Sequence, residues 1–366
     1  MQTGIRCMLM RGGTSKGAYF VAEDLPTDVQ ERDDLLLRIM GSPDSRQIDG
    51  IGGAHPLTSK VAIVSRSQSP DTDVDFLFAQ VKVGESLVDT KPNCGNILAG
   101  VGPFAIERGL VPVYSDETRV RVKTINTGTR AELIVSTPMG AVEYEGNEVI
   151  DGVPGSAAAI PINFLDTAGS VCGMLFPTGR RLENINGIET TCVDNGMPIV
   201  ILRAVDFGLS GTESCAEIDA SQDALAKIES VRIEAGQRMG LGDVSNAVVP
   251  KMFLISDPLK GMCINTRSLI PRKCHDSIGV FAAVSVATAC VLPGTIAYSM
   301  ASKPAGMTKG LNLGHPTGIF LVRLELSGTE ENPSVERGGL IRTARALFDG
   351  FVFPRAKKLK AKEGMK

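Results

Sequence analysis

The chain has 366 residues, 43% of them hydrophobic, and carries a formal net charge of −3 at pH 7. A chain of this length can bury a large core, and its length favours two domains over one. With 5% aromatic residues and no basic excess, the composition argues against nucleic acid as a partner.

The spacing of the cysteines and the length of the apolar runs indicate in which cellular compartment the protein is expected. The eight cysteines are never closer than the eleven positions between Cys263 and Cys274. This spacing provides neither a disulfide framework nor a CxxC metal motif, so we expect most thiols to be buried and reduced. The first residues lack an apolar leader, and the longest apolar run, 278–292, is too short to cross a bilayer comfortably. We therefore expect a cytoplasmic protein with no membrane partner.

The first half of the chain is predicted to contain short strands around one apolar helix. In chain order we expect a glycine turn at 10–17, a strand within 18–24, an amphipathic helix at 28–40, a glycine loop at 50–53, and strands at 60–65, 74–83, 120–124 and 131–135. Cys94 opens an uncharged helical stretch at 97–106, in which Pro103 should kink or end the helix.

Four of these features recur in the same order in the second half. They are a turn and strand after Gly196, a glycine loop and strand around Lys251, an uncharged stretch at 278–292 opened by Cys274, and a strand after the segment 315–318. Ordered recurrence of this kind indicates an internal duplication. A polar, turn-rich segment places the boundary near residue 180, and a second amphipathic helix is expected at 222–239.

A helix that is apolar on every face must be surrounded by other elements. We therefore predict an α/β (α+β) fold in which strands wrap around one central apolar helix, twice. The two domains are predicted at 1–180 and 181–353, and a Lys-rich tail at 354–366 is expected to be disordered.

Cys94 is the first candidate for chemistry. A thiol at a helix N-terminus lies at the positive end of the helix dipole, which favours the thiolate and suits proton transfer or nucleophilic attack. The same N–H donors can hold a carboxylate, which makes Asn93, Gly95 and Asn96 candidate binding residues. The alternative is that Cys94 is a small buried hydrophobic residue.

Lys60 follows Ser59, a candidate substrate-binding residue, and opens an apolar strand. Desolvation at this position favours the neutral amine, which can act as a base. The alternative is a lysine that extends from the strand end to solvent. Lys251 occupies the corresponding position in the second half, and spacing alone does not distinguish the two.

The segment 10–17, MRGGTSKG, has the wrong order for a phosphate-binding loop. We interpret it as a turn that binds a carboxylate through Arg11, Thr14, Ser15 and the backbone, with a solvated polar turn as the alternative. The loop 50–53 lacks the dinucleotide fingerprint, so no nicotinamide cofactor is implied.

Arg267 and His275 are expected near the start of the second apolar helix, where they could complete an anion site, although His275 could equally serve as a cap. The three histidines have no metal-ligand spacing, so we predict no metal.

Six ordered motifs together resemble the PrpF family, and within it the branch of 4-oxalomesaconate tautomerases and isomerases. They lie at 10–17, 48–53, 57–62, 93–96, 150–155 and 242–244, and the likeness covers roughly residues 1 to 353. The resemblance implies the diaminopimelate epimerase-like fold with its active site in the interdomain cleft. It also implies that Lys60 and Cys94 form the catalytic pair, and it gives Cys274 no acid or base role.

The implied reaction needs no cofactor. In an unsaturated tricarboxylic keto acid the allylic C–H is acidic, so an isomerase removes one proton and returns it elsewhere. We expect a small polycarboxylate substrate, in an enzyme of aromatic-acid degradation of the gallate or protocatechuate type; a homodimer is possible on composition. Three alternatives stay open: a 2-methylaconitate or aconitate isomerase of propionate metabolism, a racemase that uses Cys94 and Cys274, and a non-catalytic polycarboxylate-binding protein.

Overall fold

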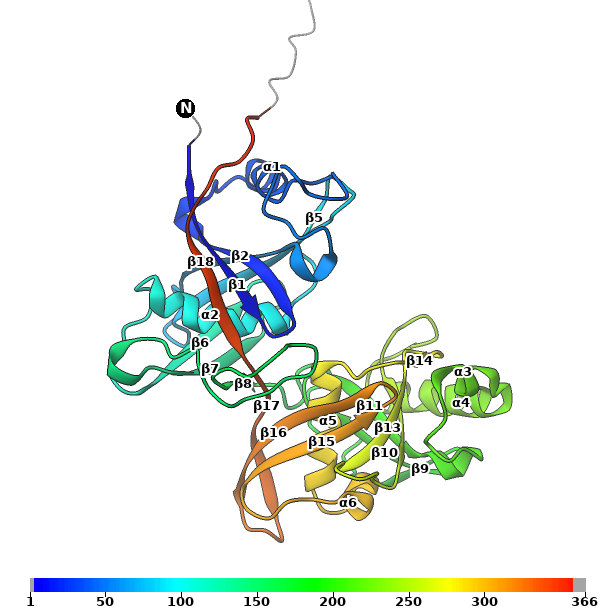
Figure 1. Cartoon of the computed structure of the whole chain (residues 1–366). Coiled ribbons are helices and arrows are strands. Elements are labelled where there is room, and N and C mark those ends of the chain that lie inside the picture. The colour runs from blue at the N-terminus through cyan, green and yellow to red at the C-terminus, as the bar shows by residue number, and fades with distance from the viewer. Residues whose placement is uncertain (1–2, 358–366) are drawn as a thin grey trace, which may run out of the picture. The chain divides into compact units, whose positions relative to one another are not determined.

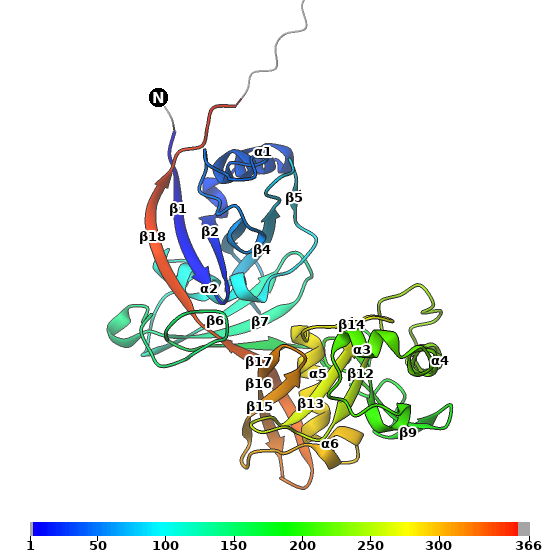
Figure 2. The ribbon, with the colours of Figure 1, turned by 45° about the vertical axis from the view of Figure 1, so that its right-hand side comes forward.

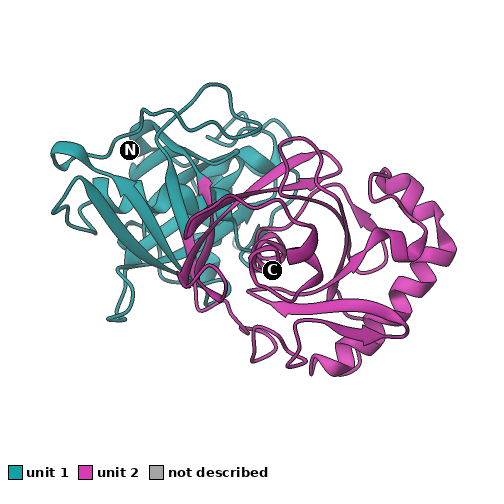
Figure 3. Cartoon of the chain, turned by 90° about the horizontal axis from the view of Figure 1, so that it is seen from below, with its two compact units in different colours: residues 1–162, 342–366 teal, residues 163–341 magenta. Residues whose placement is uncertain are grey.

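The computed structural model describes residues 3–357, and its chain divides into two compact units (Figure 3). Unit 1 comprises Met1–Ile162 and Arg342–Lys366, and unit 2 comprises Asn163–Ile341. The sequence placed the boundary near residue 180 and assigned 342–353 to the second half. The structure differs because strand pairing brings the last strand back to the first unit. Of the predicted tail, residues 358–366 lie outside the described part of the chain.

Unit 1 contains a curved sheet and two main helices (Figures 1 and 2). Its elements are β1 (Ile5–Gly12), β2 (Ser15–Val21), η1 (Ala22–Asp24), α1 (Val29–Met40), η2 (Pro56–Thr58), β3 (Lys60–Arg66), β4 (Val74–Val81), β5 (Val88–Asp89), α2 (Gly95–Glu107), β6 (Glu117–Thr124), β7 (Arg130–Ser136), η3 (Pro138–Gly140), the start of β8 (Ile160–Leu165), and β18 (Ala344–Val352).

Unit 2 contains its own set of strands and helices. Its elements are β9 (Glu183–Ile185), β10 (Ile188–Asp194), β11 (Pro198–Arg203), η4 (Ala204–Phe207), α3 (Cys215–Ala220), α4 (Gln222–Arg238), β12 (Lys251–Ser256), β13 (Ile264–Leu269), β14 (Cys274–His275), α5 (Val280–Val291), α6 (Ile296–Met300), β15 (Thr308–His315), β16 (Gly318–Gly328) and β17 (Pro333–Arg342).

The two units repeat one strand arrangement. In unit 1, β2 pairs parallel with β3, β3 antiparallel with β4, β4 parallel with β6, and β6 antiparallel with β7. In unit 2 the same four relations join β11, β12, β13, β15 and β16 in that order. The predicted duplication is therefore confirmed.

In each unit the strands pack one face on a central helix and the other on an outer helix. Successive strand residues point to opposite faces, and β11 shows the result. Ile199 and Ile201 pack with α5, whereas Val200 and Leu202 pack with α4. In Figure 3 the strands of unit 2 curve around a helix seen end-on.

The central helices α2 and α5 are buried on all sides, as their lack of charge predicts. Pro103 does not end α2, which continues to Glu107. The outer helix α1 begins with Asp28, whose side chain accepts a hydrogen bond from the N–H of Glu31, and ends at Gly41 in the left-handed conformation. None of the helices within residues 3–357 has the length and apolarity that a bilayer crossing demands.

Cys274 does not open the second central helix, which corrects the expectation from sequence. It lies in the short strand β14, and α5 begins six residues later at Val280, with Gly279 as its N-cap. Cys274 also forms a disulfide with Cys215, which opens α3, so these two thiols are not reduced. No local pattern indicates this bond, because the two residues are 59 positions apart and meet only through the fold.

Candidate functional site

Lys60 opens β3 on the face of the sheet that packs against α2. Val61 and Ile63 belong to the cluster around α1, so the alternation of the strand directs Lys60 to the opposite face. The residue as a whole is 9% exposed. Its Nζ donates a hydrogen bond of 2.8 Å to Oε1 of Gln80 and lies 5.0 Å from the ring centroid of Phe78. Lys60 is therefore a buried amine with a neutral partner, and it does not extend to solvent.

Cys94 is the N-cap residue of α2, as predicted. Its backbone N–H donates to the side chain of Asn93 at 2.8 Å, and its carbonyl accepts the N–H of Leu98 at 2.9 Å. The thiol makes no capping hydrogen bond and is partly exposed. A Cβ at Gly95 would meet nothing within 4 Å, so the space beside the first turn of the helix is open. This arrangement leaves a thiol and helix N–H groups at the positive end of the dipole.

The predicted carboxylate-binding turn packs directly on the first turn of α2. Asn96 donates from Nδ2 to the hydroxyl of Thr14 at 2.9 Å, and Arg342 donates from Nε to Oδ1 of Asn96 at 3.3 Å. Gly13 has φ of +51°, and a Cβ there would lie 2.2 Å from Oδ1 of Asn96. The glycine is thus required by both backbone conformation and space.

Gly17 brings the start of β3 close to the start of α2. It lies opposite Lys60 in the parallel pair of β2 and β3. A Cβ at Gly17 would lie 2.6 Å from the carbonyl oxygen of Lys60 and 3.1 Å from Cδ1 of Ile97. The buried hydroxyl of Tyr19 donates to the carbonyl of Ile97 at 2.6 Å. Lys60 and Cys94 therefore begin two elements that are in direct contact within unit 1.

Arg11 differs from the predicted free donor, whereas the Ser15 hydroxyl is buried and has no partner among the described residues. Nη1 of Arg11 is occupied by the carbonyl of Gly13 at 3.0 Å and by the carbonyl and hydroxyl of Thr343 at 3.1 and 2.9 Å. Desolvation, followed by the charge of Arg345, lowers the pKa of the Arg11 guanidinium. Ser15 is 2% exposed, and its Oγ has no hydrogen-bond partner among the described residues.

Ser59 forms a hydrogen bond that stabilises the loop before β3. Its Oγ donates to Oε1 of Gln47 at 2.7 Å, and the same oxygen accepts the N–H of Ala54 at 2.9 Å. Ser59 therefore fixes the entry of the chain into β3, one residue before Lys60.

Arg267 and His275 belong to unit 2. Arg267 is 6% exposed, and its Nε and Nη1 donate to the carbonyls of Glu213 and Thr266 at 2.6 and 2.9 Å. Burial lowers the pKa of this guanidinium. His275 is exposed, and its Nδ1 lies 3.0 Å from the carbonyl of Ser277. Their part in the site stays a prediction.

Gln80 and Arg342 were missed by sequence reasoning. Gln80 follows Val74, Phe76 and Phe78 in the inward-facing positions of β4, and a polar residue in such a series is a usable signal. Arg342 carried no signal, because it contacts Asn96 only through the return of the chain from β17 to unit 1.

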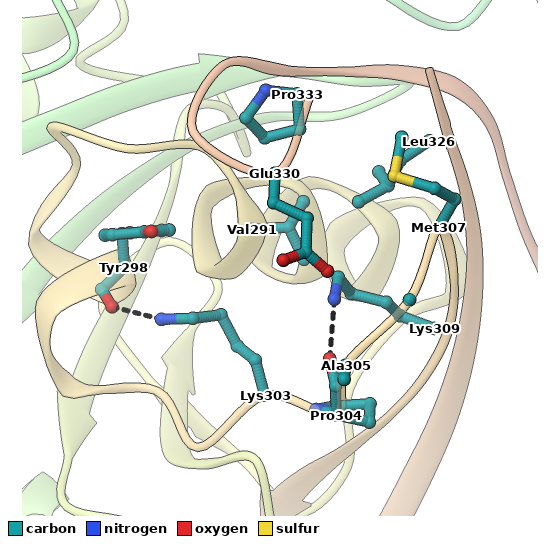
Figure 4. Close-up of a pocket in the computed structure, with 11 residues that line it drawn as sticks. Val291, Tyr298, Lys303, Pro304, Ala305, Met307, Lys309, Leu326, Glu330 and Pro333 are labelled. Carbon is teal, nitrogen blue, oxygen red and sulfur yellow. Dashed lines mark hydrogen bonds between the residues drawn. The ribbon is translucent and has the colours of Figure 1, made fainter. Parts of the chain in front are cut away.

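One cavity of unit 2, of about 260 Å³, contains none of the predicted residues (Figure 4). Its lysine ammonium groups already donate to backbone carbonyls. Lys303 donates to Tyr298 at 2.6 Å, and Lys309 donates to Pro304 at 2.5 Å. We therefore base the site on Lys60 and Cys94.

Comparison with known proteins gives a consistent result. The PrpF protein family matches residues 2–355. The 4-oxalomesaconate tautomerase of Pseudomonas putida is 54% identical over 351 residues, which cover 96% of each chain. The (4E)-oxalomesaconate Delta-isomerase of a Novosphingobium species is 53% identical and covers 95% of this chain and 96% of its own. The crystal structure of a methylitaconate-delta-isomerase, 33% identical, superposes with a TM-score of 0.84 over 99% of this chain and 100% of that one.

Proposed function

This chain belongs to the PrpF protein family and is an isomerase, and we propose that it moves a proton and a double bond in 4-oxalomesaconate. Two relatives that share more than half of their residues with this chain carry that substrate in their names. The proposal places the enzyme in the cytoplasm, in the degradation of aromatic acids of the gallate or protocatechuate type. A homodimer stays a prediction from composition.

Lys60 is proposed as the base. The neutral amine takes a proton from a carbon next to the conjugated system, and the C–H electron pair forms a new double bond while the original one shifts toward the keto group. The product of this step is a dienolate, and Lys60 is left as an ammonium. The observation that carries the assignment is a buried amine whose hydrogen-bond partner, Gln80, is a neutral amide.

Cys94 is proposed to deliver the proton at the other end of the conjugated system, or to relay it. Its position at the start of α2 places helix N–H groups beside it, and these groups stabilise negative charge on the dienolate and its carboxylates. One proton leaves and one returns, so the reaction is redox-neutral and atoms balance without a cofactor.

Binding of the substrate carboxylates is proposed for Thr14, Ser15, Asn93, Gly95 and Asn96. Gly95 supports this role best, because the space beside it is open. Asn96 and Thr14 are also hydrogen-bonded to each other, so they position the N–H groups in the first turn of α2 as well. For Arg11 and Ser59 the same positioning role fits their hydrogen bonds.

The experiment is turnover of 4-oxalomesaconate by the purified protein, followed by ultraviolet absorbance and by NMR in D₂O. Lys60→Ala and Cys94→Ala should each lower kcat by about 10²-fold or more, since general acid and base groups contribute about that much. Lys227→Ala, at an exposed position on α4, is the matched control. Near-normal turnover by both site variants would show that the pair is misassigned.

A second candidate is an isomerase of methylitaconate or of 2-methylaconitate or aconitate. It is favoured by the methylitaconate-delta-isomerase structure, which matches this chain over nearly its whole length. Side-by-side kcat/KM values for these acids and 4-oxalomesaconate decide between them. The two-cysteine racemase is not retained, because Cys274 is bonded to Cys215. Tight tricarboxylate binding without proton exchange would instead support a binding protein.

A further inference from the structure

Gln80 lies directly opposite Lys60 in the antiparallel pair of β3 and β4. We propose that Gln80 is a positioning residue that aims the Lys60 amine and keeps it without a carboxylate partner. The inference rests on the proposed role of Lys60 as the base, and it adds a residue that determines both the geometry and the working pH of that base.

The hydrogen bonds of Gln80 fix which end of its amide faces Lys60. Nε2 donates to the carbonyls of Pro56 and Ser59 at 3.1 and 3.0 Å. A carbonyl can only accept, so the NH₂ end must point toward these two groups. Oε1 is thereby directed at Nζ of Lys60, 2.8 Å away. The amide cannot turn over without placing its oxygen against two carbonyl oxygens.

The loop that orients Gln80 is itself fixed by hydrogen bonds to the buried side chain of Gln47. Gln47 is 1% exposed, and its Oε1 accepts from Ser59 at 2.7 Å while its Nε2 donates to Ser42 at 3.1 Å. This contact fixes Ser59, whose carbonyl holds the amide of Gln80. The chain of contacts therefore runs from the loop before β3 through Gln80 to the amine.

An amide oxygen suits a lysine that must lose its proton. It accepts one N–H from either the amine or the ammonium, so it orients Nζ in both states and leaves the lone pair of the amine free. A carboxylate at the same place would stabilise the ammonium and oppose its role as a base. Among residues 3–357, no carboxylate forms an ion pair with Lys60.

The other ionisable groups near this end of β3 come from the elements that pack around it. They include Lys16 and Tyr19 on β2, His55 at the start of η2, Asp89 on β5, opposite Gln80, and Cys94 at the start of α2. Asp89 accepts from the N–H of Lys91. Gln80 is in direct hydrogen-bond contact with Nζ of Lys60, so a charge introduced at this position acts on the amine at the shortest distance.

Unit 2 provides an internal comparison. Lys251 opens β12 as Lys60 opens β3, but its side chain has no hydrogen bond within the described residues. Met252 lies opposite Leu269 in the antiparallel pair of β12 and β13. Continuing this register by one residue places the apolar Ile270 opposite Lys251, where unit 1 has Gln80 opposite Lys60. The repeated strand arrangement thus carries the amide acceptor in unit 1 and lacks it in unit 2.

The test replaces Gln80 in two ways and measures pH–rate profiles of the full chain. Gln80→Glu keeps the size and adds a charge, so the acidic limb of kcat/KM should move up by about one pH unit or more. Gln80→Met removes the acceptor, so kcat should fall on the order of 10²-fold through misplacement of the amine, without that upward movement. Gln237→Glu, exposed on α4, is the control for added charge.

A second readout does not depend on turnover. Labelling of Lys60 by acetic anhydride across pH, followed by peptide mass spectrometry, reports the protonation of the amine, and Gln80→Glu should shift that curve upward by the same amount. If both Gln80 variants keep the wild-type profile, kcat and labelling curve, the inference is overturned. If Gln80→Glu does not fold, wild-type kcat in Gln80→Met overturns it alone. If Lys60→Ala keeps its turnover, Lys60 is not the base. The labelling curve of Lys60 in Gln80→Glu still tests the contact between Gln80 and Lys60 in that case.

Discussion

Lys60 and Lys251 hold the same position in two copies of one strand arrangement, yet only Lys60 faces an amide acceptor. Each opens a strand that runs parallel to an earlier strand of its unit, and each lies on the face toward the central helix. Nζ of Lys60 donates to Gln80. Nζ of Lys251 instead lies 3.8 Å from the place that a Cβ would take at Gly279, the N-cap residue of α5. The duplication therefore contains a lysine at the same position in each unit, and the two lysines differ in their hydrogen-bond partners.

Lys251→Met should raise the free energy of unfolding at neutral pH. Burial lowers the pKa of Lys251, so the folded state disfavours its ammonium. The resulting penalty is complete below the folded pKa and disappears as pH rises from that value toward the unfolded value of about 10.4. Urea unfolding from pH 7 to 10 should show the stability of the wild type approaching that of the variant. A constant gap across this range would contradict the expected linkage.

Alkylation should distinguish Cys94 from Cys172. Both are partly exposed, whereas the other four free cysteines are buried. Desolvation and the nearby Asp194 raise the pKa of Cys172 to about 11, so its thiolate is scarce at pH 7.5. We expect iodoacetamide to label Cys94 first and to abolish turnover, as peptide mapping and activity will show. Cys94→Ser is the control, and faster labelling of Cys172 would count against this assignment.

The disulfide between Cys215 and Cys274 should be visible as a thiol count. In denaturant without reductant, six thiols per chain should react with Ellman's reagent, rising to all eight cysteines after reduction. Closing a loop of 59 residues stabilises the fold by about 4 kcal/mol in the chain-entropy model. Cys274→Ser should lower the free energy of unfolding by up to that amount. Eight reactive thiols before reduction would show that the bond is absent in solution.

Gly13→Ala should damage both stability and activity. The left-handed backbone disfavours alanine by about 1–2 kcal/mol, and its Cβ would strike the side chain of Asn96, which holds the first turn of α2. Gly128→Ala is the matched control, because Gly128 has φ of +71° and no atom within 4 Å of a Cβ. Thermal unfolding and kcat/KM should show a larger loss for Gly13→Ala. Equal losses in the two variants would mean that the contact with Asn96 is unimportant.

Features that depend on local pattern were predictable from the sequence. The amphipathic helices at 28–40 and 222–239 and the uncharged helix at 278–292 agree with α1, α4 and α5, because periodicity and lack of charge report directly on burial. Cys94 was placed correctly at a helix start, since Asn and Gly around it favour a cap. The duplication was visible because four local signals recur in order.

Features that depend on contacts between distant segments were not predictable. The pairing of Cys215 with Cys274 needs α3 and β14 to meet, and no local pattern encodes that approach. The acceptor of Lys60 depends on the register of β3 with β4, which spacing alone does not fix. The unit boundary at Arg342 depends on which edge receives β18.

The pairing of β18 with β1 has a consequence for how the chain folds as it is synthesised. Unit 2 is one continuous segment, Asn163–Ile341, whereas unit 1 needs residues from both sides of it. On a ribosome, β1 therefore waits with an unpaired edge until Ala344–Val352 has emerged, although every other strand of its sheet is already available. The first unit to be translated is the last to be completed, and a nascent chain that stops before residue 344 exposes the edge of β1 to aggregation.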